Sequence, residues 1–194
     1  MMKCYIEITL LPCVEVPINF LWEKVYQQVH LALVEKQDAR GKVNIGVSFP
    51  EYDGKKHSLG RKLRLLALSK EDLENINIDN WLSRLIDYVQ IAGIQDVPKT
   101  TNVYAIFKRI QTKSSNARLA RRKAKREGIS YDQALSLLNH RKEQISKVPY
   151  LHMKSLSTGR RFRLMIDCVE TIKTNDVEGF STYGLSSDSS VPVF

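Results

Sequence analysis

The sequence has 194 residues, and 30 Lys and Arg against 21 Asp and Glu give it a net charge of +9. Nine of the basic residues lie between Lys108 and Arg126, where no acidic residue occurs, so the rest of the chain is neutral. This balance disfavours a protein that is basic throughout, such as a ribosomal protein or a histone, because one segment holds the whole excess.

The composition predicts a folded chain, since 43% of the residues are hydrophobic and the length suits one large or two small domains. No apolar run approaches the roughly 20 residues that cross a bilayer, and Glu7 interrupts the apolar N-terminal stretch. We therefore expect a cytoplasmic protein without a signal peptide. The three cysteines lack a C-x-x-C spacing and the four histidines are scattered, which predicts no disulfide framework, no metal site and no cofactor.

The first half of the chain alternates between strand and helix patterns. Apolar residues recur at helical spacing over residues 19–35, and Ser69, with Asp72 three residues later, is a favourable N-cap for a second helix. In chain order we expect a strand at 3–11, a helix at 19–35, strands at 42–49 and 64–68, a helix at 69–89 and a strand at 103–111. This order predicts an α+β chain with a ferredoxin-like (split βαβ) N-terminal domain, a fold that does not by itself imply a function.

The second half predicts a basic helix over residues 115–127, which Gly128 would end. It also predicts a second helix that opens on a capping box of Ser130 and Gln133 and continues until Pro149. The remainder is typical of β-hairpins, over residues 150–172 and 180–186. We place a boundary near residue 97, with residues 1–97 as the ferredoxin-like domain and residues 98–194 as an α+β domain that carries the basic helix.

One face of the basic helix carries a continuous stripe of cations at positions i, i+3, i+4 and i+7, namely Arg118, Arg121, Arg122 and Lys125. Like charges at these spacings repel by about 0.2–0.5 kcal/mol per pair, and a polyanion relieves the repulsion. A solvated basic face is the plain alternative. A run without acid on a neutral background favours nucleic acid instead, bound through phosphates and therefore with strong salt dependence.

Arg109 and Gln111 precede the basic helix and lie two residues apart in an extended segment, so their side chains share one side. Arginine suits a bidentate contact with guanine, and glutamine suits adenine. From spacing alone, ordinary strand polarity is the better explanation of the pair.

Four stretches together resemble the type I-F CRISPR repeat-processing endoribonuclease family. They are IGVSFPEYDGKKHSLGRKLRL (45–65), RIQTKSSNARLARRKAKR (109–126), SLSTGRRFRL (155–164) and TYGLS (182–186). They occur in the family's order with compatible spacing, so the resemblance covers nearly the whole chain and is more specific than any single stretch. It implies a ferredoxin-like N-terminal domain followed by a C-terminal domain with an arginine-rich helix.

The resemblance implies a metal-independent endoribonuclease. Such an enzyme binds the short stem-loop of each CRISPR repeat in a precursor transcript and cuts at the 3′ base of the hairpin. The cut leaves a 2′,3′-cyclic phosphate and a 5′-hydroxyl. The enzyme then retains the mature guide RNA as a subunit of the type I-F surveillance complex, an antiviral ribonucleoprotein.

Position by position, the resemblance also implies site residues. The catalytic histidine falls on His30, and the active-site hydroxyls fall on Ser155, which positions the ribose, and on Ser157 and Tyr183. Phe162 is expected to stack on the closing base pair of the stem, and Arg109 and Gln111 to read bases near its foot. The phosphate contacts expected from the basic segment come from Lys113, Arg118, Arg121, Arg122, Lys125 and Arg126.

The chemistry of the residues agrees with these roles. RNA supplies its own nucleophile, the 2′-hydroxyl, and histidine accepts a proton near neutral pH because its ordinary pKa is about 6.5. Without the resemblance, His30 would be interpreted as a structural histidine and Phe162 as a core residue. We expect His57 and His140 on the surface and leave His152 open.

Two other functions stay open. A non-catalytic RNA-hairpin-binding subunit of a ribonucleoprotein would share the binding but not the cut, and a DNA-binding regulator would place the basic helix in a major groove. The sequence also departs from the family in two places. Lys123 and Lys125 lack the planar fork of the arginines expected there. The Ser-rich C-terminal SSDSSVPVF stands where the family has glycines and a further aromatic, so the family's contacts of that tail are not carried over to this chain.

Overall fold

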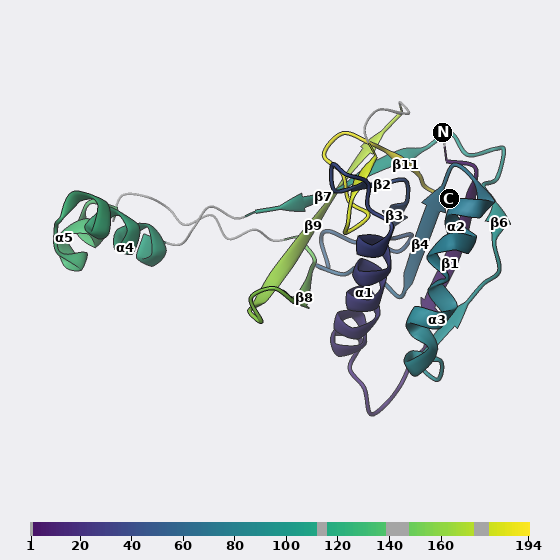
Figure 1. Ribbon diagram of the computed structural model, residues 1–194, viewed down its shortest axis with the longest axis horizontal. Coiled ribbons are helices and arrows are strands. Elements are labelled where there is room, and N and C mark those ends of the chain that lie inside the picture. Colours follow the sequence, from purple (N-terminus) through teal and green to yellow (C-terminus); the bar gives the residue numbers. More distant parts are fainter. Residues whose placement is uncertain (1, 112–115, 139–147, 173–178) are drawn as a thin grey trace. The chain divides into compact units, whose positions relative to one another are not determined.

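The computed structural model describes residues 2–111, 116–138, 148–172 and 179–194 (Figure 1). Its helices are α1 Ile18–Glu35, α2 Lys70–Ile76, α3 Ile78–Leu82, α4 Asn116–Glu127 and α5 Tyr131–Ser136, with a short 3-10 turn η1 at Ser83–Leu85. Its strands are β1 Cys4–Leu10, β2 Lys42–Val43, β3 Gly46–Ser48, β4 Lys62–Ala67, β5 Val89–Ile91, β6 Gln95–Asp96, β7 Tyr104–Ile110, β8 Tyr150–Lys154, β9 Arg161–Thr171, β10 Phe180–Ser181 and β11 Val191–Pro192. The expected mixture of helices and strands is confirmed. Within the described ranges, no helix is long and apolar enough to cross a membrane.

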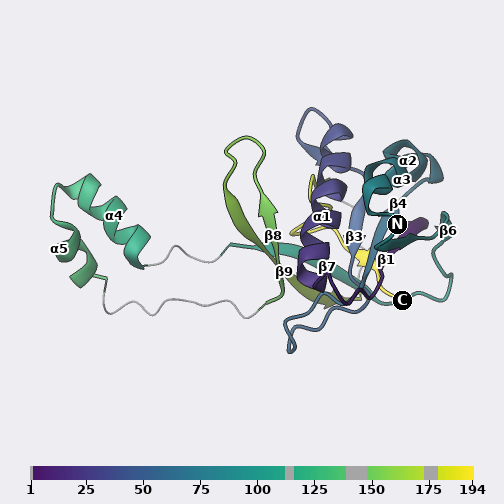
Figure 2. The same ribbon diagram turned by 90° about the horizontal axis from the view of Figure 1, so that it is seen from below.

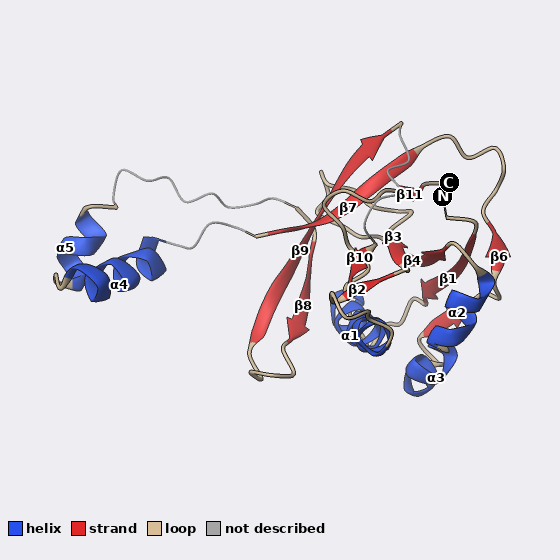
Figure 3. Cartoon of the chain, turned by 45° about the horizontal axis from the view of Figure 1, so that its top comes forward, coloured by secondary structure: helices blue, strands red, loops and turns tan. Residues whose placement is uncertain are grey.

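The N-terminal sheet is antiparallel, with the strand order β3-β4-β1-β5 and with β6 also paired to β1. Helices α1, α2 and α3 cover one face of it (Figure 3). Ile6, Ile8 and Leu10 are buried on alternate positions of β1 and pack in one cluster with Val25 and Val29 of α1, because alternate side chains of a strand share a face. The sheet and α1 therefore share a single core.

Helix α1 agrees with the predicted helix to within one residue, and the predicted N-cap of the next helix is also confirmed. The Ser69 hydroxyl accepts a hydrogen bond from the Asp72 backbone N–H at 3.2 Å. A serine in this position satisfies one of the N–H groups that the first helical turn leaves without a partner.

The single strand predicted at 42–49 is wrong. Lys42–Val43 pairs with β10 in a separate two-stranded sheet, whereas Gly46–Ser48 pairs with β4. Gly46 lies under the ring of Phe180, which a Cβ at this position would approach to 2.6 Å. Alternation of apolar residues did not show the break, because Val43 and Val47 are buried on either side of it.

The single helix predicted at 69–89 is also wrong. Asn77 adopts a left-handed conformation (φ 47, ψ 53) and ends α2, and asparagine is one of the few residues that adopt it readily. The chain restarts as α3, and Val89–Ile91 then forms β5 at the edge of the sheet.

A second antiparallel sheet has the order β11-β7-β9-β8. The expected strand at 103–111 and the expected hairpin after residue 150 are both confirmed, and Figure 2 shows the β8–β9 hairpin beside α1. Gly159 has a φ of 64° in the turn between β8 and β9, a conformation that glycine adopts without steric cost.

Helices α4 and α5 form a compact unit of their own. Gly128, with a φ of 66°, follows the last residue of α4, and Ser130 and Gln133 make both bonds of the expected capping box. Ala120 of α4 is fully buried. The continuation of the second helix predicted up to residue 148 lies mostly outside the described residues.

The chain forms two compact units, whose bounds differ from those of the two domains predicted on either side of residue 97. One unit comprises Met1–Ile110 and Val148–Phe194, and the other comprises Gln111–Lys147. Leu164 and Ile166 of β9 belong to the same hydrophobic cluster as β1 and α1, so the C-terminal sheet packs with the N-terminal one. The division at residue 97 as a functional boundary stays a prediction.

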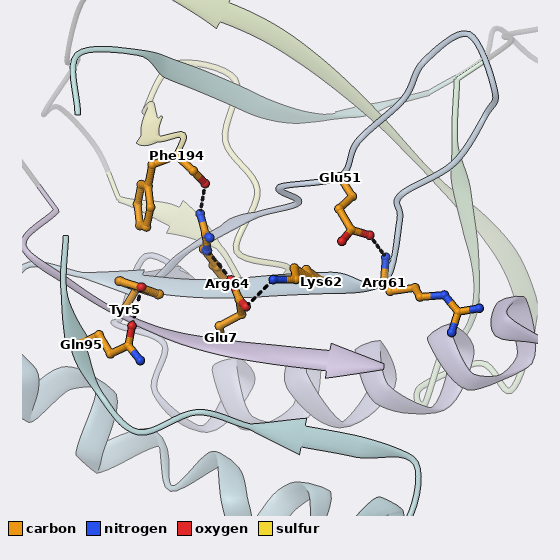
Figure 4. Close-up of polar contacts among 8 residues, drawn as sticks. All are labelled: Tyr5, Glu7, Glu51, Arg61, Lys62, Arg64, Gln95 and Phe194. Carbon is orange, nitrogen blue, oxygen red and sulfur yellow. Dashed lines mark hydrogen bonds and ion pairs between the residues drawn. The ribbon is translucent and has the colours of Figure 1, made fainter. Parts of the chain in front are cut away.

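The face of the N-terminal sheet opposite the helices carries a partly buried ion-pair cluster (Figure 4). Glu7 accepts hydrogen bonds from Lys62 at 2.9 Å and from Arg64 at 2.8 Å. Burial alone would raise the pKa of Glu7, but these two hydrogen bonds and the positive charges of Lys62 and Arg64 together hold the pKa below its usual value. Arg64 also donates to the carbonyl oxygen of Phe194 and lies 4.0 Å from its ring centroid, which fastens the C-terminal segment to the sheet.

Candidate active site

His30 lies on α1 beside the loop that contains the TYGLS stretch. Its Nδ1 is 2.8 Å from the carbonyl oxygen of Thr182. Because a carbonyl only accepts hydrogen bonds, Nδ1 carries the proton and Nε2 carries the free lone pair. Burial lowers the pKa of His30, and the Thr182 hydrogen bond opposes that effect only in part. The imidazole is therefore neutral at neutral pH, with Nε2 able to accept a proton.

Tyr183 fixes the plane of this imidazole. The two ring centroids are 4.1 Å apart and the rings are within 5° of parallel. The Tyr183 carbonyl oxygen accepts a hydrogen bond of 2.8 Å from the hydroxyl of Tyr26, a buried residue one turn before His30 on α1. Helix α1 thus binds the carbonyls of two successive loop residues, Thr182 through His30 and Tyr183 through Tyr26.

The residue after Tyr183 must be glycine for this arrangement. Gly184 has a φ of 68°, and a Cβ at this position would lie 2.4 Å from Cγ1 of Val47 and 3.3 Å from the Val47 backbone nitrogen. The Val47 N–H also donates to the Gly184 carbonyl at 2.9 Å. The close approach of β3 to this loop therefore sets the position of Tyr183.

The predicted Arg109 and Phe162 come together next to Tyr183. The Arg109 guanidinium lies 5.4 Å from the Phe162 ring centroid and 5.6 Å from the Tyr183 ring centroid, within the range of cation–π attraction. Phe162 is half-buried, and the adjacent Arg161 and Arg163 are exposed, as expected for the opposite face of a strand. One arginine therefore links the expected stacking residue to the expected catalytic tyrosine.

Ser155 and Ser157 lie in the turn between β8 and β9. Their hydroxyl oxygens are 3.2 Å apart, and the Ser155 hydroxyl accepts from the Thr158 N–H at 3.3 Å. The preceding residue, Lys154, donates its backbone N–H to the Gln27 side chain of α1 at 3.1 Å. Since Gln27 lies one turn before His30, this bond brings the start of the serine turn alongside the helix that carries the histidine.

The basic helix α4 presents its cations to solvent. The side chains of Arg118, Arg121, Arg122 and Lys125 are exposed, as the predicted stripe requires. Arg126 and Lys123 pair with Glu127, at 2.7 Å and 3.1 Å. Glu127 directly follows the acid-free run and partly neutralises these two cations at the end of the helix.

The other predicted residues are spread over the chain. Gln111 is exposed and follows the end of β7, as the first residue of the α4–α5 unit. Lys113 and His140 lie outside the described residues. His57 is exposed in a loop, as expected, and His152 is exposed on β8. In the described part of the chain, no three His, Cys, Asp or Glu side chains gather in a way that could hold a metal ion.

Sequence reasoning missed Tyr26, Gln27 and Thr182. Tyr26 and His30 are four residues apart and therefore share a helix face, which was a usable signal. The Tyr26 hydroxyl, on a face otherwise occupied by apolar residues, needed a partner that only the fold reveals. Thr182 acts through its backbone carbonyl, and the Gln27 side chain binds a backbone N–H, so neither contact leaves a pattern in the sequence.

Comparisons with known proteins identify relatives along the whole chain. Residues 5–194 match the model of the family described as CRISPR-associated protein (Cas_Csy4). A CRISPR-associated endonuclease Cas6/Csy4 of Escherichia coli (strain UTI89 / UPEC) is 34% identical over 193 residues, and one of Pseudomonas aeruginosa (strain UCBPP-PA14) is 35% identical over 193 residues. Both alignments cover 100% of this chain and 100% of the relative.

Two solved structures are also similar to the chain. One is described as an RAMP protein binding different RNA substrates, with a TM-score of 0.38, 12% identity and 100% of both chains covered. The other is described as the product of a Cas6-related gene from Pyrococcus furiosus, with a TM-score of 0.34, 12% identity and 98% of both chains covered. At these scores neither likeness supports a statement about this chain.

Proposed function

We infer that this chain, which belongs to the Cas_Csy4 family of CRISPR-associated proteins, is a site-specific endoribonuclease that processes CRISPR repeat RNA. It binds the repeat stem-loop and cuts at the 3′ base of the stem. The observation that carries the proposal is the anchored imidazole of His30, with Nδ1 on the Thr182 carbonyl and its ring on Tyr183. Among the described residues, no hydrogen bond to its Nε2 is present.

The proposed reaction is an attack by the RNA on itself. The ribose 2′-oxygen before the scissile bond forms a bond to phosphorus as the bond from phosphorus to the 5′-oxygen breaks. His30 Nε2 takes the proton of the 2′-hydroxyl, the departing 5′-oxygen takes a proton from water, and the products are a 2′,3′-cyclic phosphate and a 5′-hydroxyl. The reaction needs no metal ion to generate its nucleophile.

The other active-site residues position the substrate. Ser155 holds the ribose, with Ser157 beside it, so that the 2′-oxygen approaches in line with the leaving oxygen. Tyr183 keeps the imidazole in plane. Phe162 stacks on the last base pair of the stem, and Arg109, next to both rings, contacts a base at its foot.

The basic helix α4 supplies the affinity, through contacts of its exposed stripe with stem phosphates. Gln111 is proposed to read a base beside Arg109, and Lys113 and Arg126 to add phosphate contacts. After the cut the protein retains the guide RNA as a subunit of a type I-F surveillance complex in the cytoplasm. These assignments follow the family resemblance and are supported by the exposure of the stripe.

We also propose that the N-terminal part has the ferredoxin-like (split βαβ) fold. The support is the antiparallel order β3-β4-β1-β5, in which β4 lies between β3 and β1, the two strands that α1 connects. That insertion of a strand into a βαβ unit defines the split arrangement.

A repeat RNA with a single 2′-deoxy nucleotide before the scissile phosphate tests the proposal. The protein is expected to bind the modified and unmodified stem-loops equally, to cut only the unmodified one, and to do so in EDTA. Intact unmodified RNA after incubation with the protein in EDTA would show that the metal-free nuclease assignment is wrong and favour the hairpin-binding subunit. Preference for a DNA duplex of the same sequence would favour the regulator.

The cleavage rate is expected to depend on pH through His30. Burial lowers the pKa of His30 in the free protein. The second-order rate constant of single-turnover cleavage, measured at subsaturating protein, should therefore rise with a midpoint below the ordinary value of 6.5 and be flat at neutral pH. The same shift makes unfolded His30 bind protons at higher pH than folded His30. The contribution of His30 to the free energy of unfolding is therefore complete above pH 6.5. It declines as the pH falls from that value to the lower pKa of folded His30. A rate midpoint above 6.5 would contradict the assignment of His30 as the base.

Tyr26 is expected to act as a positioning residue. Tyr26→Phe removes only the hydroxyl that binds the Tyr183 carbonyl, which is then buried without this partner at a cost of about 1–3 kcal/mol. We expect a lower melting temperature and a roughly tenfold slower single-turnover cut, because 1.4 kcal/mol of lost alignment corresponds to a factor of about ten.

A matched control separates this effect from general destabilisation. The Tyr52 hydroxyl also donates to a backbone carbonyl, that of Ile166 at 3.2 Å, outside the TYGLS loop. Tyr52→Phe should lower the melting temperature and leave the cleavage rate unchanged. Equal losses of rate in the two variants would remove the positioning role from Tyr26.

A further inference from the structure

The β8–β9 hairpin has a second exposed face, opposite the one that carries Phe162. We define the hairpin outer face by four exposed side chains, two on each strand: Tyr150, His152, Arg161 and Arg163. His152 and Arg163 are direct cross-strand partners. None of these four residues has a role in the proposed reaction.

The four side chains form a connected platform. The rings of Tyr150 and His152 meet edge to face with centroids 5.3 Å apart, and the Arg163 guanidinium lies 4.9 Å from the Tyr150 centroid. His152, Arg161 and Arg163, with Phe162 between the two arginines, line a hollow of about 340 Å³. Such a hollow has room for one nucleobase between flat groups.

The chemistry of the platform favours unpaired RNA. Aromatic rings and arginine planes beside positive charge are the groups on which single-stranded bases stack, and stacking needs no particular sequence. The positive charge of the face is also suitable for contact with RNA phosphates. Arg161 pairs with Glu23 at 3.2 Å, yet its side chain is 70% exposed. A hydrophobic protein partner would find little apolar surface among two arginines and a histidine.

The location relates the platform to the substrate. Phe162, the residue proposed to stack on the foot of the stem, lies between Arg161 and Arg163 in β9, and alternate strand residues point to opposite faces. RNA that continues past the foot of the stem therefore needs to pass only around the edge of the hairpin to reach the hairpin outer face.

We propose that the hairpin outer face binds an unpaired nucleotide of the RNA that flanks the repeat stem. Its base stacks in the hollow against His152 and Arg163, and Arg161 contacts its phosphate. The proposal rests on the proposed function, because it takes the stem foot to lie at Phe162. It adds a contact outside the stem, so the protein should distinguish a repeat within a longer transcript from a bare hairpin.

The test compares dissociation constants of fluorescent stem-loops that carry no flank, a 5′ flank or a 3′ flank, each made uncleavable by the 2′-deoxy substitution. For the wild-type protein, one flank should tighten binding about tenfold, since stacking of one base on an aromatic group is worth about 1–3 kcal/mol. In Arg163→Gln and in His152→Ala, the ratio of the constants with and without that flank should fall toward one. Arg84→Gln, which removes an exposed arginine elsewhere in the same compact unit, should keep the wild-type ratio.

Two outcomes would overturn the proposal: no gain from either flank in the wild type, or the same gain in the wild type and in both platform variants. If the variants keep the gain but no longer associate with other complex subunits, the face binds protein instead. Failure of the proposed function is separable, because it would appear as intact unmodified RNA whatever the flank. Circular dichroism melting of each variant excludes unfolding as the cause of a changed ratio.

Discussion

His30→Ala is expected to bind the repeat stem-loop as tightly as the wild type and to cut it about 10²–10⁴-fold more slowly, the usual contribution of a general base. The reason is geometric. Nδ1 is committed to the Thr182 carbonyl, so Nε2 is the nitrogen available to the 2′-hydroxyl, and alanine removes both. Single-turnover cleavage and a filter-binding titration on the same RNA measure the two effects separately.

Alanine also removes the anchor of the TYGLS loop, and a second variant separates that loss from loss of the base. The amide of asparagine can still donate to the Thr182 carbonyl but cannot accept a proton at neutral pH. We expect His30→Asn to melt closer to the wild type than His30→Ala and to be equally inactive. His57→Asn, at an exposed loop histidine with a φ of 53° that asparagine tolerates, should cut normally. Normal cutting by His30→Asn would remove the histidine from the chemistry.

The sequence predicted elements well where local signals decide the structure. The periodicity of α1, the Ser69 cap and the Ser130–Gln133 capping box all involve residues within one or two turns of each other, and all three are confirmed. The predicted element bounds were wrong where a contact distant in sequence, or an unusual backbone conformation, determines where an element ends. The break at Asn77 depends on a left-handed residue in an apolar helical pattern, and the division of residues 42–49 depends on Phe180, more than 130 positions away.

The candidate site shows the same limit. The family resemblance named His30, Tyr183, Phe162 and Arg109, and the structure brings these four side chains into one connected group. The atom that selects the free nitrogen of the imidazole is a backbone carbonyl, which every residue possesses, so no side-chain pattern could have identified Thr182. The role of Tyr26 depends on the same loop and was missed for the same reason.

The second large effect is expected from the basic stripe of α4. Replacing Arg121, Arg122 and Lys125 by glutamine keeps helix-forming side chains of similar reach and removes three charges. If each cation contacts one phosphate, the slope of log affinity against log salt should become shallower by about 2 to 3. The variant should bind far more weakly than the wild type at low salt and approach it at high salt, where counterions already screen the stem.

The control for this variant removes the same charge elsewhere. Lys36, Arg84 and Lys99 are exposed cations of the other compact unit, and their triple replacement by glutamine should leave the slope at its wild-type value. Equal changes of slope in the two variants would mean that net charge, rather than the stripe, governs binding. An unchanged slope in the α4 variant would exclude contact between the stripe and the phosphates. The cut itself should survive in the α4 variant at saturating protein, because the groups that perform it lie in the part of the chain whose charges sum to zero.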